Sequence, residues 1–293
     1  MNDASAAPSP PLIHRPYGQT GRHLSVIGLG GIAIMNVAQA EANDTVAWGV
    51  DRGVNYFDVA PTYSNAQDRL GPALKPYRDQ AFLACKTTRR DAVGVREELE
   101  HSLKVLQTDH VDLYQLHGLT KPEEVETCFG PGGAMEVFTK AREEGKVRWL
   151  GFSAHDPQTA LLAFEHFKFD SVLFPFNAIL MQHDFGPQVI AAAKQRGAAR
   201  LGLKAIAWSP MPQGAERKYP GCWYMPQDDP AMAGLLLRYA LDLPITATVP
   251  PGDARLFKLC VELAQHYTPL TEPERAQLMT ATEGVEPIFG HHA

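Results

Sequence analysis

Eight short, almost uninterrupted apolar runs are spread along the chain, separated by segments with the spacing of amphipathic helices. The runs lie at 23–31, 55–60, 82–88, 111–118, 147–154, 171–177, 203–210 and 245–251. Strands that are apolar on both faces are typical of a parallel sheet buried under helices. Three helical segments end at Gly53, Gly145 and Gly197, where a glycine C-cap is expected. The pattern therefore predicts strands and helices in strict alternation.

Eight strand–helix units in 293 residues predict an α/β fold, a closed (β/α)8 TIM barrel in a single domain. A doubly wound open sheet is the alternative, because it is built from the same alternation. Residues 1–15 contain prolines and no long apolar run, so we expect a flexible N-terminal lead-in that is a poor signal peptide. Residues 16–293 would then form the barrel with a C-terminal tail.

The composition limits the classes of partner. A net charge of −6 argues against nucleic acid, whose phosphates would be repelled. No apolar stretch approaches the roughly 18 residues that indicate a membrane span. The four cysteines, Cys85, Cys128, Cys222 and Cys260, form no CxxC pair. We therefore expect reduced thiols in a cytoplasmic protein, with neither a disulfide framework nor a metal site.

Polar residues stand at the ends of three consecutive runs. Asp58 ends the second, Lys86 lies near the end of the third, and His117 near the end of the fourth. Alternation along a strand puts Lys86 on the same face as Phe82 and Ala84. Each residue alone would more often be a solvated loop residue or a core histidine. In a barrel, however, they would be neighbours at the catalytic mouth, and a buried lysine needs a partner such as Asp58.

These groups, with Tyr63 in the loop after the second run, suit general acid catalysis. An unperturbed tyrosine has a pKa near 10, and a lysine ammonium beside it is expected to lower that pKa. Asp58 would hold Lys86 charged, and His117 could orient a carbonyl oxygen. Such a site can protonate an alkoxide as it forms, but it needs a hydride donor, usually a nicotinamide cofactor.

The segments carrying these residues resemble the aldo-keto reductase superfamily. "YFDVAPTYS" is similar to the family segment with the catalytic Asp and Tyr, "LACKTT" to the strand with its Lys, and "VDLYQLHG" to the strand with its His. The resemblance extends over nearly the whole chain. It implies that Asp58, Tyr63, Lys86 and His117 are the catalytic residues, with Tyr63 as proton donor. It also implies that NAD(P)H lies across the barrel mouth.

The same resemblance implies a set of cofactor-binding residues. "GLGG" is similar to the turn at the nicotinamide ribose, "GFSAH" to the segment whose serine binds the carboxamide, "AWSP" to the segment with a ring on the nicotinamide, and "VPPGDARLFKL" to the grip on the adenosine 2′-phosphate. The residues are, in chain order, Gly30, Gly31, Ile32, Ser153, Asn177, Trp208, Ser209, Pro210, Gly252, Arg255 and Lys258.

Two positions depart from the family pattern. Ala154 stands where an asparagine is common, and Leu173 where a glutamine is common. The carboxamide would therefore lose two usual hydrogen bonds unless His155 or Asn177 replaces them. Asp253 would repel a 2′-phosphate, although the positive charges nearby favour NADP(H) over NAD(H).

The resemblance implies a small-molecule carbonyl or alcohol substrate, with the aromatic segment 219–226 available to wall its pocket. Two other functions remain open. One is a cofactor-binding regulatory or sensor barrel with low turnover. The other is a barrel isomerase or lyase that works without nicotinamide. Neither the physiological substrate, nor the direction of reaction, nor the oligomeric state is indicated by the sequence.

Overall fold

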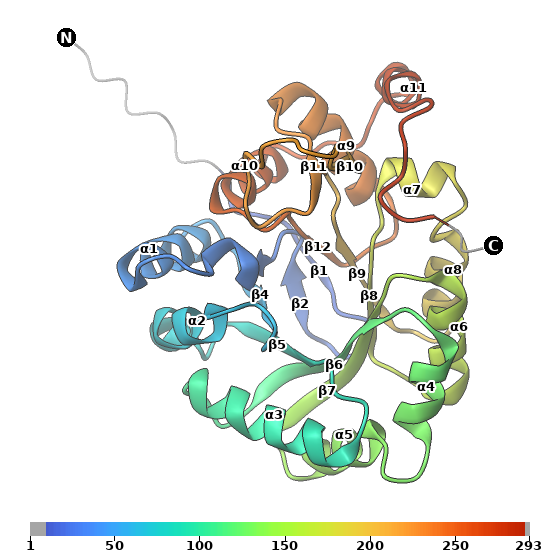
Figure 1. Ribbon diagram of the computed structural model, residues 1–293. Coiled ribbons are helices and arrows are strands. Elements are labelled where there is room, and N and C mark those ends of the chain that lie inside the picture. Colours follow the sequence, from blue (N-terminus) through green and yellow to red (C-terminus); the bar gives the residue numbers. More distant parts are fainter. Residues whose placement is uncertain (1–9, 291–293) are drawn as a thin grey trace.

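The computed structural model describes residues 10–290 and shows a (β/α)8 barrel in a single domain (Figure 1). The parallel sheet has the order β12-β9-β8-β7-β6-β5-β4-β3. A parallel bridge between Ile27 and Thr248 joins its two ends, with Gly28 N donating to Thr248 O at 3.0 Å. The barrel strands are β3 (Leu29–Gly30), β4 (Tyr56–Asp58), β5 (Phe82–Thr87), β6 (Val111–Leu119), β7 (Val147–Ala154), β8 (Ser171–Phe174), β9 (Ala199–Leu203) and β12 (Ala247–Val249).

Helices surround this sheet and bury its outer face, as the apolar runs predict (Figure 1). They are α1 (Gln39–Val50), α2 (Ala66–Leu74), α3 (Ala92–Val105), α4 (Pro122–Phe129), α5 (Ala134–Glu143), α6 (Pro157–His166), α7 (Ala178–Gln182), α8 (Pro187–Gln195), α9 (Pro230–Asp242), α10 (Ala254–Gln265) and α11 (Glu272–Ala281). Two short 3-10 helices are η1 (Gly31–Ile34) and η2 (Lys75–Tyr77). Gly53, Gly145 and Gly197 have φ of 90°, 77° and 70°, which confirms their predicted place after helices.

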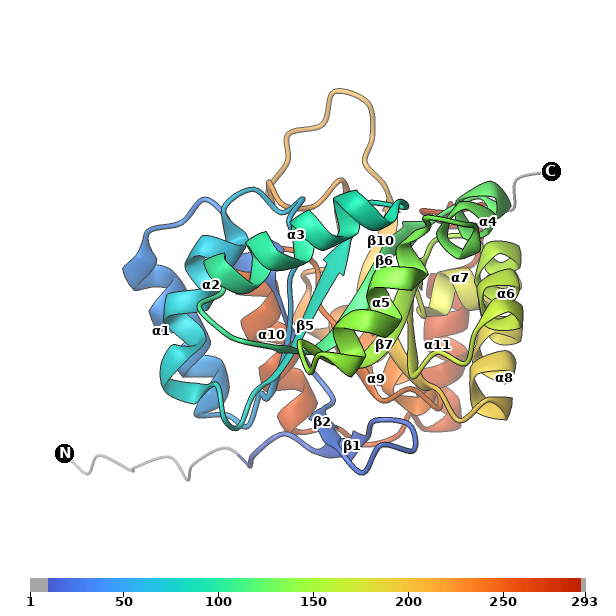
Figure 2. The ribbon, with the colours of Figure 1, turned by 90° about the horizontal axis from the view of Figure 1, so that it is seen from below.

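The barrel interior is filled by side chains that alternate along the strands. Phe82 and Ala84 of β5 point inward, as predicted, and the ring of Phe82 stacks on Trp149 with centroids 5.6 Å apart. The bottom is closed by a hairpin of β1 (His14–Pro16) and β2 (His23–Ser25). In Figure 2 this hairpin lies at the end opposite the loop between β10 (Ala207–Pro210) and β11 (Tyr224–Pro226). The two ends of the barrel are therefore unlike, and only one carries long loops.

The sequence predicts a flexible lead-in of residues 1–15, but part of that stretch is folded against the barrel. Residues 1–9 lie outside the described residues. Leu12 is buried, and its N–H donates to Arg52 O at 3.1 Å, while His14 begins β1. The barrel unit therefore includes residues before position 16.

The seventh barrel strand was placed wrongly by the sequence prediction of 203–210. The strand in the sheet is β9, which pairs with β8 and β12, whereas β10 pairs antiparallel with β11 outside the barrel. The reason is Arg200, which interrupts the apolar pattern of β9 while its guanidinium donates to Ala198 O. Lys204 then leaves the strand conformation with φ of 61°. The residue delivered to the mouth by strand seven is therefore Lys204.

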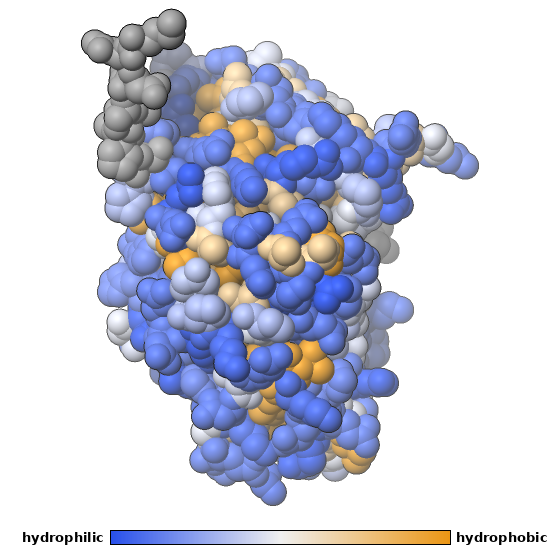
Figure 3. Space-filling view, turned by 90° about the vertical axis from the view of Figure 1, so that its left-hand side faces the viewer, coloured by the Kyte–Doolittle hydropathy of each residue, from blue (hydrophilic) through white to orange (hydrophobic). Residues whose placement is uncertain are grey.

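The surface around α1, α2 and α10 is mostly hydrophilic, with small separated hydrophobic spots (Figure 3). Large exposed hydrophobic side chains among the described residues are few, and Trp223 and Met225 are two of them. Within the described residues, no helix is both long and apolar enough to cross a membrane.

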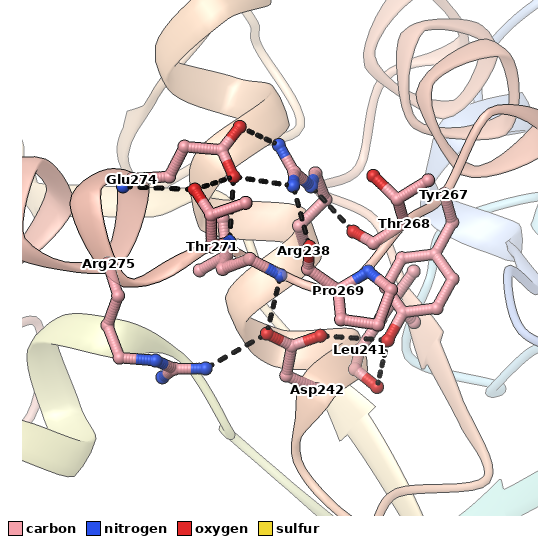
Figure 4. Close-up of polar contacts among 10 residues, drawn as sticks. Arg238, Leu241, Asp242, Tyr267, Thr268, Pro269, Thr271, Glu274 and Arg275 are labelled. Carbon is pink, nitrogen blue, oxygen red and sulfur yellow. Dashed lines mark hydrogen bonds and ion pairs between the residues drawn. The ribbon is translucent and has the colours of Figure 1, made fainter.

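Arg238 of α9 holds the C-terminal helix α11 against the barrel (Figure 4). Its guanidinium makes a two-pronged ion pair with Glu274, at 2.6 and 2.8 Å. It also donates to the carbonyl oxygens of Thr268 and Pro269. Glu274 completes a capping box with Thr271, which fixes the start of α11. Arg238 thus binds both the segment between α10 and α11 and the first turn of α11.

We expect Arg238→Met to lower the thermal midpoint by about 2–4 °C, the change that follows from losing about 1 kcal/mol in a chain of this length. Arg238→Lys should restore little, because an ammonium cannot form the two-pronged contact. Differential scanning calorimetry measures this, with the exposed Arg96→Met on α3 as the control. Equal midpoints for Arg238→Met and Arg96→Met would contradict the proposed role.

Candidate active site

An ion pair between Lys86 and Asp58 lies at the mouth of the barrel, where β4 and β5 end. Lys86 Nζ donates to Asp58 Oδ1, and the two residues are only 1% and 3% exposed. The other carboxylate oxygen accepts from Gln115 Nε2 at 3.1 Å and from Tyr56 OH at 3.3 Å. A buried carboxylate is tolerated when it is paired and hydrogen-bonded in this way. Asp58 is therefore fixed by three neighbouring groups.

Tyr63 lies above this pair, between two nitrogen atoms. Its hydroxyl is 3.5 Å from Lys86 Nζ and 3.5 Å from His117 Nε2. The rings of Tyr63 and His117 meet edge to face with centroids 5.6 Å apart. The structure thus brings the four residues expected from the sequence, Asp58, Tyr63, Lys86 and His117, into one contact network. Whether they catalyse a reaction is a separate matter, treated below.

Burial controls the protonation of this network. Burial alone would lower the pKa of Lys86, but Asp58 and Tyr63 outweigh it, and the pKa is raised, so the ammonium is kept. Burial raises the pKa of Tyr63, and Lys86 offsets that only in part. The expectation that Lys86 would lower the pKa of Tyr63 below its ordinary value is therefore wrong, because desolvation is the larger effect. Tyr63 keeps its proton at neutral pH.

His117 is a neutral imidazole at neutral pH. Burial, followed by the charges of Lys86, Arg90 and Lys204, lowers the pKa of His117 to about 3. Its backbone oxygen accepts from Arg90 at 2.8 Å, which ties this end of β6 to the loop after β5. Its Nδ1 has no hydrogen-bond partner among the described residues. A neutral ring with Nε2 next to the Tyr63 hydroxyl can donate one hydrogen bond to a carbonyl oxygen.

A cavity of about 100 Å³ opens beside Asp58 and Tyr63. Its other lining residues come from the ends of several strands and from the loop before β11, and they include Gly30, Ile32, Leu173, Leu203, Lys204, Gly221, Trp223, Tyr224 and 249–252. A second cavity of about 450 Å³ runs on toward the start of α10, lined in part by Asn36, Glu41, Asp253 and Arg255. Ile32, Gly221 and Gly252 line both cavities. These three residues stand between the two cavities, which are neighbours at the barrel mouth.

Glycines allow the chain to pack closely around these cavities. A Cβ on Gly252 would lie 2.3 Å from Ile32 Cγ2, and one on Gly30 would lie 2.7 Å from Val249 Cγ1. Gly31 is buried at the start of η1, where a Cβ would lie 2.7 Å from Val59. Three of the predicted cofactor residues, Gly30, Ile32 and Gly252, line the first cavity, whereas Gly31 lines neither cavity.

Other predicted cofactor residues lie elsewhere or already have protein partners. Trp208, Ser209 and Pro210 belong to β10 and line neither cavity, because the seventh barrel strand ends before them. The Lys258 ammonium lies 5.5 Å from the Trp48 ring centroid, outside both linings. Arg255 lines the second cavity, but Asp253 binds its guanidinium at 2.9 Å through two oxygens.

Ser153 and Asn177 are both buried and support the backbone. Ser153 Oγ accepts from Gly118 N at 2.7 Å. Asn177 caps α7 by accepting from Leu180 N, and its amide donates to Lys204 O at 3.1 Å. Each side chain retains one donor hydrogen that these bonds do not use.

Sequence reasoning did not single out Gln115, Tyr56 and Lys204. The first two had a usable signal, because each lies two residues before a predicted site residue and so faces the same side of its strand. Lys204 was hidden by the shift of the seventh strand. Trp223 and Tyr224 of the predicted aromatic segment do line the cavity.

The profile of the aldo/keto reductase family matches residues 26–221 of the chain. The chain belongs to this family. Membership supports oxidoreductase activity in general and agrees with the barrel described above. The family resemblance seen in the sequence is thereby confirmed.

Individual aldo/keto reductase relatives are similar over part of their length. The aldo-keto reductase YhdN of Bacillus subtilis is 33% identical over 153 residues, 46% of this chain and 44% of that protein. L-galactose dehydrogenase of Arabidopsis thaliana is 29% identical over 154 residues, 47% of each chain. The chain thus spans less than half of the length of these curated relatives.

Solved structures of aldo/keto reductases share the fold over nearly the whole chain. The holo form of AKR11C1 from Bacillus halodurans superposes with a TM-score of 0.74 at 24% identity, covering 94% of this chain and 98% of that one. A Klebsiella pneumoniae aldo/keto reductase, in complex with NADP and acetate, superposes with a TM-score of 0.68 at 21% identity, covering 94% and 97%.

Breaking the buried ion pair should strongly lower the stability of the fold. We expect Lys86→Met to lower the free energy of unfolding by about 3–5 kcal/mol, because Asp58 is left buried and uncompensated. The double variant Asp58→Asn/Lys86→Met should lose less than the sum of the two single variants. Urea unfolding measures both, with the exposed Lys75→Met as the control. Simple additivity would contradict the ion pair.

Proposed function

We propose that this aldo/keto reductase reduces an aldehyde or ketone to an alcohol, or runs the reverse reaction, with NAD(P)H and with Tyr63 as the general acid or base. The observation that carries the proposal is the position of the Tyr63 hydroxyl, 3.5 Å from both Lys86 Nζ and His117 Nε2 at the edge of a cavity. A protonated hydroxyl held beside a cation is suited to give its proton to a developing alkoxide.

Each residue of the network has a distinct task in this proposal. The neutral His117 donates a hydrogen bond to the carbonyl oxygen and orients it toward Tyr63. Tyr63 transfers its proton to that oxygen, and Lys86 stabilises the phenolate that remains. Asp58 holds Lys86 in place and charged. A nicotinamide cofactor, when bound, would supply the hydride for the carbonyl carbon.

The two neighbouring cavities are the place that we propose for a dinucleotide. Gly30, Ile32 and Gly252 line the first cavity, and the second cavity ends at the N-terminus of α10, which favours a phosphate. The family resemblance assigns Ser153 and Asn177 to the carboxamide, and each retains one donor hydrogen, although neither residue lines either cavity. Trp208, Ser209 and Pro210 line neither cavity and are poorly placed for a direct role.

NADP(H) remains the cofactor we propose, with limited discrimination against NAD(H). Arg255 is the cation in the second cavity that a 2′-phosphate could use, while Lys258 lies outside its lining. A 2′-phosphate must compete with Asp253 for the Arg255 guanidinium. The NADP in the Klebsiella pneumoniae structure belongs to that protein and supports the proposal by likeness of fold.

The substrate we propose is a small carbonyl or alcohol compound, and the compartment is the cytoplasm. The four cysteines are free and buried, in agreement with reduced thiols. Their burial raises the pKa of Cys85, Cys128 and Cys222 to about 11, so none of these three is a thiolate at neutral pH. They are packing residues in this proposal.

Tyr63→Phe should lower kcat/KM for an aldehyde by about 10²- to 10⁴-fold, the usual contribution of a positioned acid. The Kd for NADPH, followed by protein fluorescence, should change little, because the hydroxyl acts mainly in the transition state. Tyr267→Phe is the matched control, because Tyr267 is half-buried, lies far from the mouth and donates its hydroxyl hydrogen bond to Asp242. Full activity in Tyr63→Phe would eliminate this residue as the proton donor.

Asp253→Asn should increase the preference for NADPH over NADH. The amide oxygen can still cap α10 by accepting from Arg255 N, but it no longer neutralises the guanidinium. Arg255→Met should abolish the preference. The measurement is the ratio of the two dissociation constants for each variant. An unchanged ratio in Asp253→Asn would show that Asp253 does not control cofactor choice.

A further inference from the structure

Lys204 is a second lysine at the barrel mouth. It follows β9 directly. Its backbone has the left-handed conformation, with φ of 61°, which is uncommon for a residue other than glycine and is held in place by its surroundings. The Asn177 amide, bonded to Lys204 O, is one such restraint. The side chain lines the same cavity as Asp58 and Tyr63. It therefore faces the space in which the proposed reaction takes place.

The Lys204 ammonium is surrounded by rings. It lies 5.5 Å from the ring centroid of Phe289, 5.9 Å from that of Trp223 and 6.0 Å from that of Tyr224. Over residues 10–290, no carboxylate lies within ion-pair distance of it, in contrast to Lys86. Cation–π contacts stabilise a partly buried ammonium only in part. Lys204 thus carries a charge for which the described part of the chain supplies no counter-ion.

Below about pH 7, where Lys204 is protonated, the cavity has a net positive charge even though the chain has a net charge of −6. Asp58 and Lys86 cancel each other. His117 is neutral, and burial together with Lys204 lowers the pKa of His155 well below its usual value, so that ring is neutral too. Lys204 is left as the uncompensated charge, which favours an anionic ligand.

The rings around Lys204 indicate that this lysine faces the substrate rather than a cofactor phosphate. Phe289 stacks on His155 with centroids 4.9 Å apart, which places the C-terminal segment beside the mouth. The proposed function already assigns the cofactor phosphates to the second cavity, at the start of α10 beside Arg255. Lys204 lines the first cavity, with Tyr63, and not the second.

We propose that Lys204 binds a carboxylate of the substrate, so that the enzyme acts on carbonyl compounds that also carry an acid group. Trp223, Tyr224 and Phe289 would pack against the apolar part between the acid and the carbonyl. This inference rests on the proposed reductase function and names its substrate class. Lys204 is a specificity-determining residue here, distinct from the residues that transfer the proton.

The acid preference should depend on pH. Burial, aided by Lys86, lowers the pKa of Lys204 to about 7, so the free ammonium is lost as the pH rises through that value. Asp58 faces this region as the ion-pair partner of Lys86. The other titratable groups that face it keep one state near pH 7, and they are Tyr63, Lys86, His117, His155, Cys222 and Tyr224. A bound carboxylate raises the pKa of Lys204, so that in the complex the ammonium is lost at a higher pH.

The test compares 4-carboxybenzaldehyde with its methyl ester as substrates, with NADPH as the reductant. In the wild type, the acid should have the higher kcat/KM at pH 6, and the acid-to-ester ratio should fall at pH 9. Lys204→Met should lower the ratio at pH 6 roughly 10- to 100-fold, as expected on losing a charge-assisted hydrogen bond. Lys204→Arg should retain most of it.

Two results would overturn the proposal. One is an acid-to-ester ratio unchanged by Lys204→Met. The other is a weaker Kd for NADPH in Lys204→Met with that ratio intact, which would assign Lys204 to the cofactor. Failure of the wild type to reduce either aldehyde would instead count against the reductase function. In that event, tighter binding of the acid than the ester, measured by fluorescence without cofactor and lost in Lys204→Met, would still support the carboxylate site, and equal binding would refute it.

Discussion

The ion pair between Asp58 and Lys86 is the interaction on which the mouth of this barrel depends. Two charges at 3% and 1% exposure are stable only because each compensates the other and because Gln115 and Tyr56 occupy the remaining carboxylate oxygen. The register of β4 and β5 pairs Asp58 with Ala84, which brings Lys86, two residues further on, over the end of β4. Sheet geometry and electrostatics thus agree on one arrangement.

The ion pair also affects the protonation states of the groups above it. Lys86 remains an ammonium, and it faces the hydroxyl of a tyrosine whose pKa is raised by burial. Burial, aided by the same positive charge, keeps His117 neutral and lowers the pKa of Lys204 to about 7. The barrel mouth therefore contains a protonated acid, a neutral hydrogen-bond donor and a cation with adjustable charge. That combination suits carbonyl reduction of an anionic compound.

Much of the fold could be predicted, because strands buried on both faces and capped helices leave strong local patterns. Alternation along a strand also placed Lys86 correctly beside Asp58. The seventh strand was missed because Arg200 breaks the apolar run, while the neighbouring segment "AIAWSP" is more apolar and was chosen instead. Contacts made over long sequence separations, such as Phe289 with Lys204, and the balance of burial against charge at Tyr63, need three-dimensional packing to be known.

The most direct test of the central claim, that Tyr63 protonates the carbonyl oxygen as hydride arrives, is a pair of isotope effects on kcat/KM for one aldehyde. NADPH labelled with deuterium at the transferred position reports hydride transfer, and D2O as solvent reports the proton. We expect both substitutions to slow the same step, with the D2O effect largest when hydride transfer limits the rate. A clear primary effect with labelled NADPH and no effect of D2O would contradict proton transfer from Tyr63 in that step.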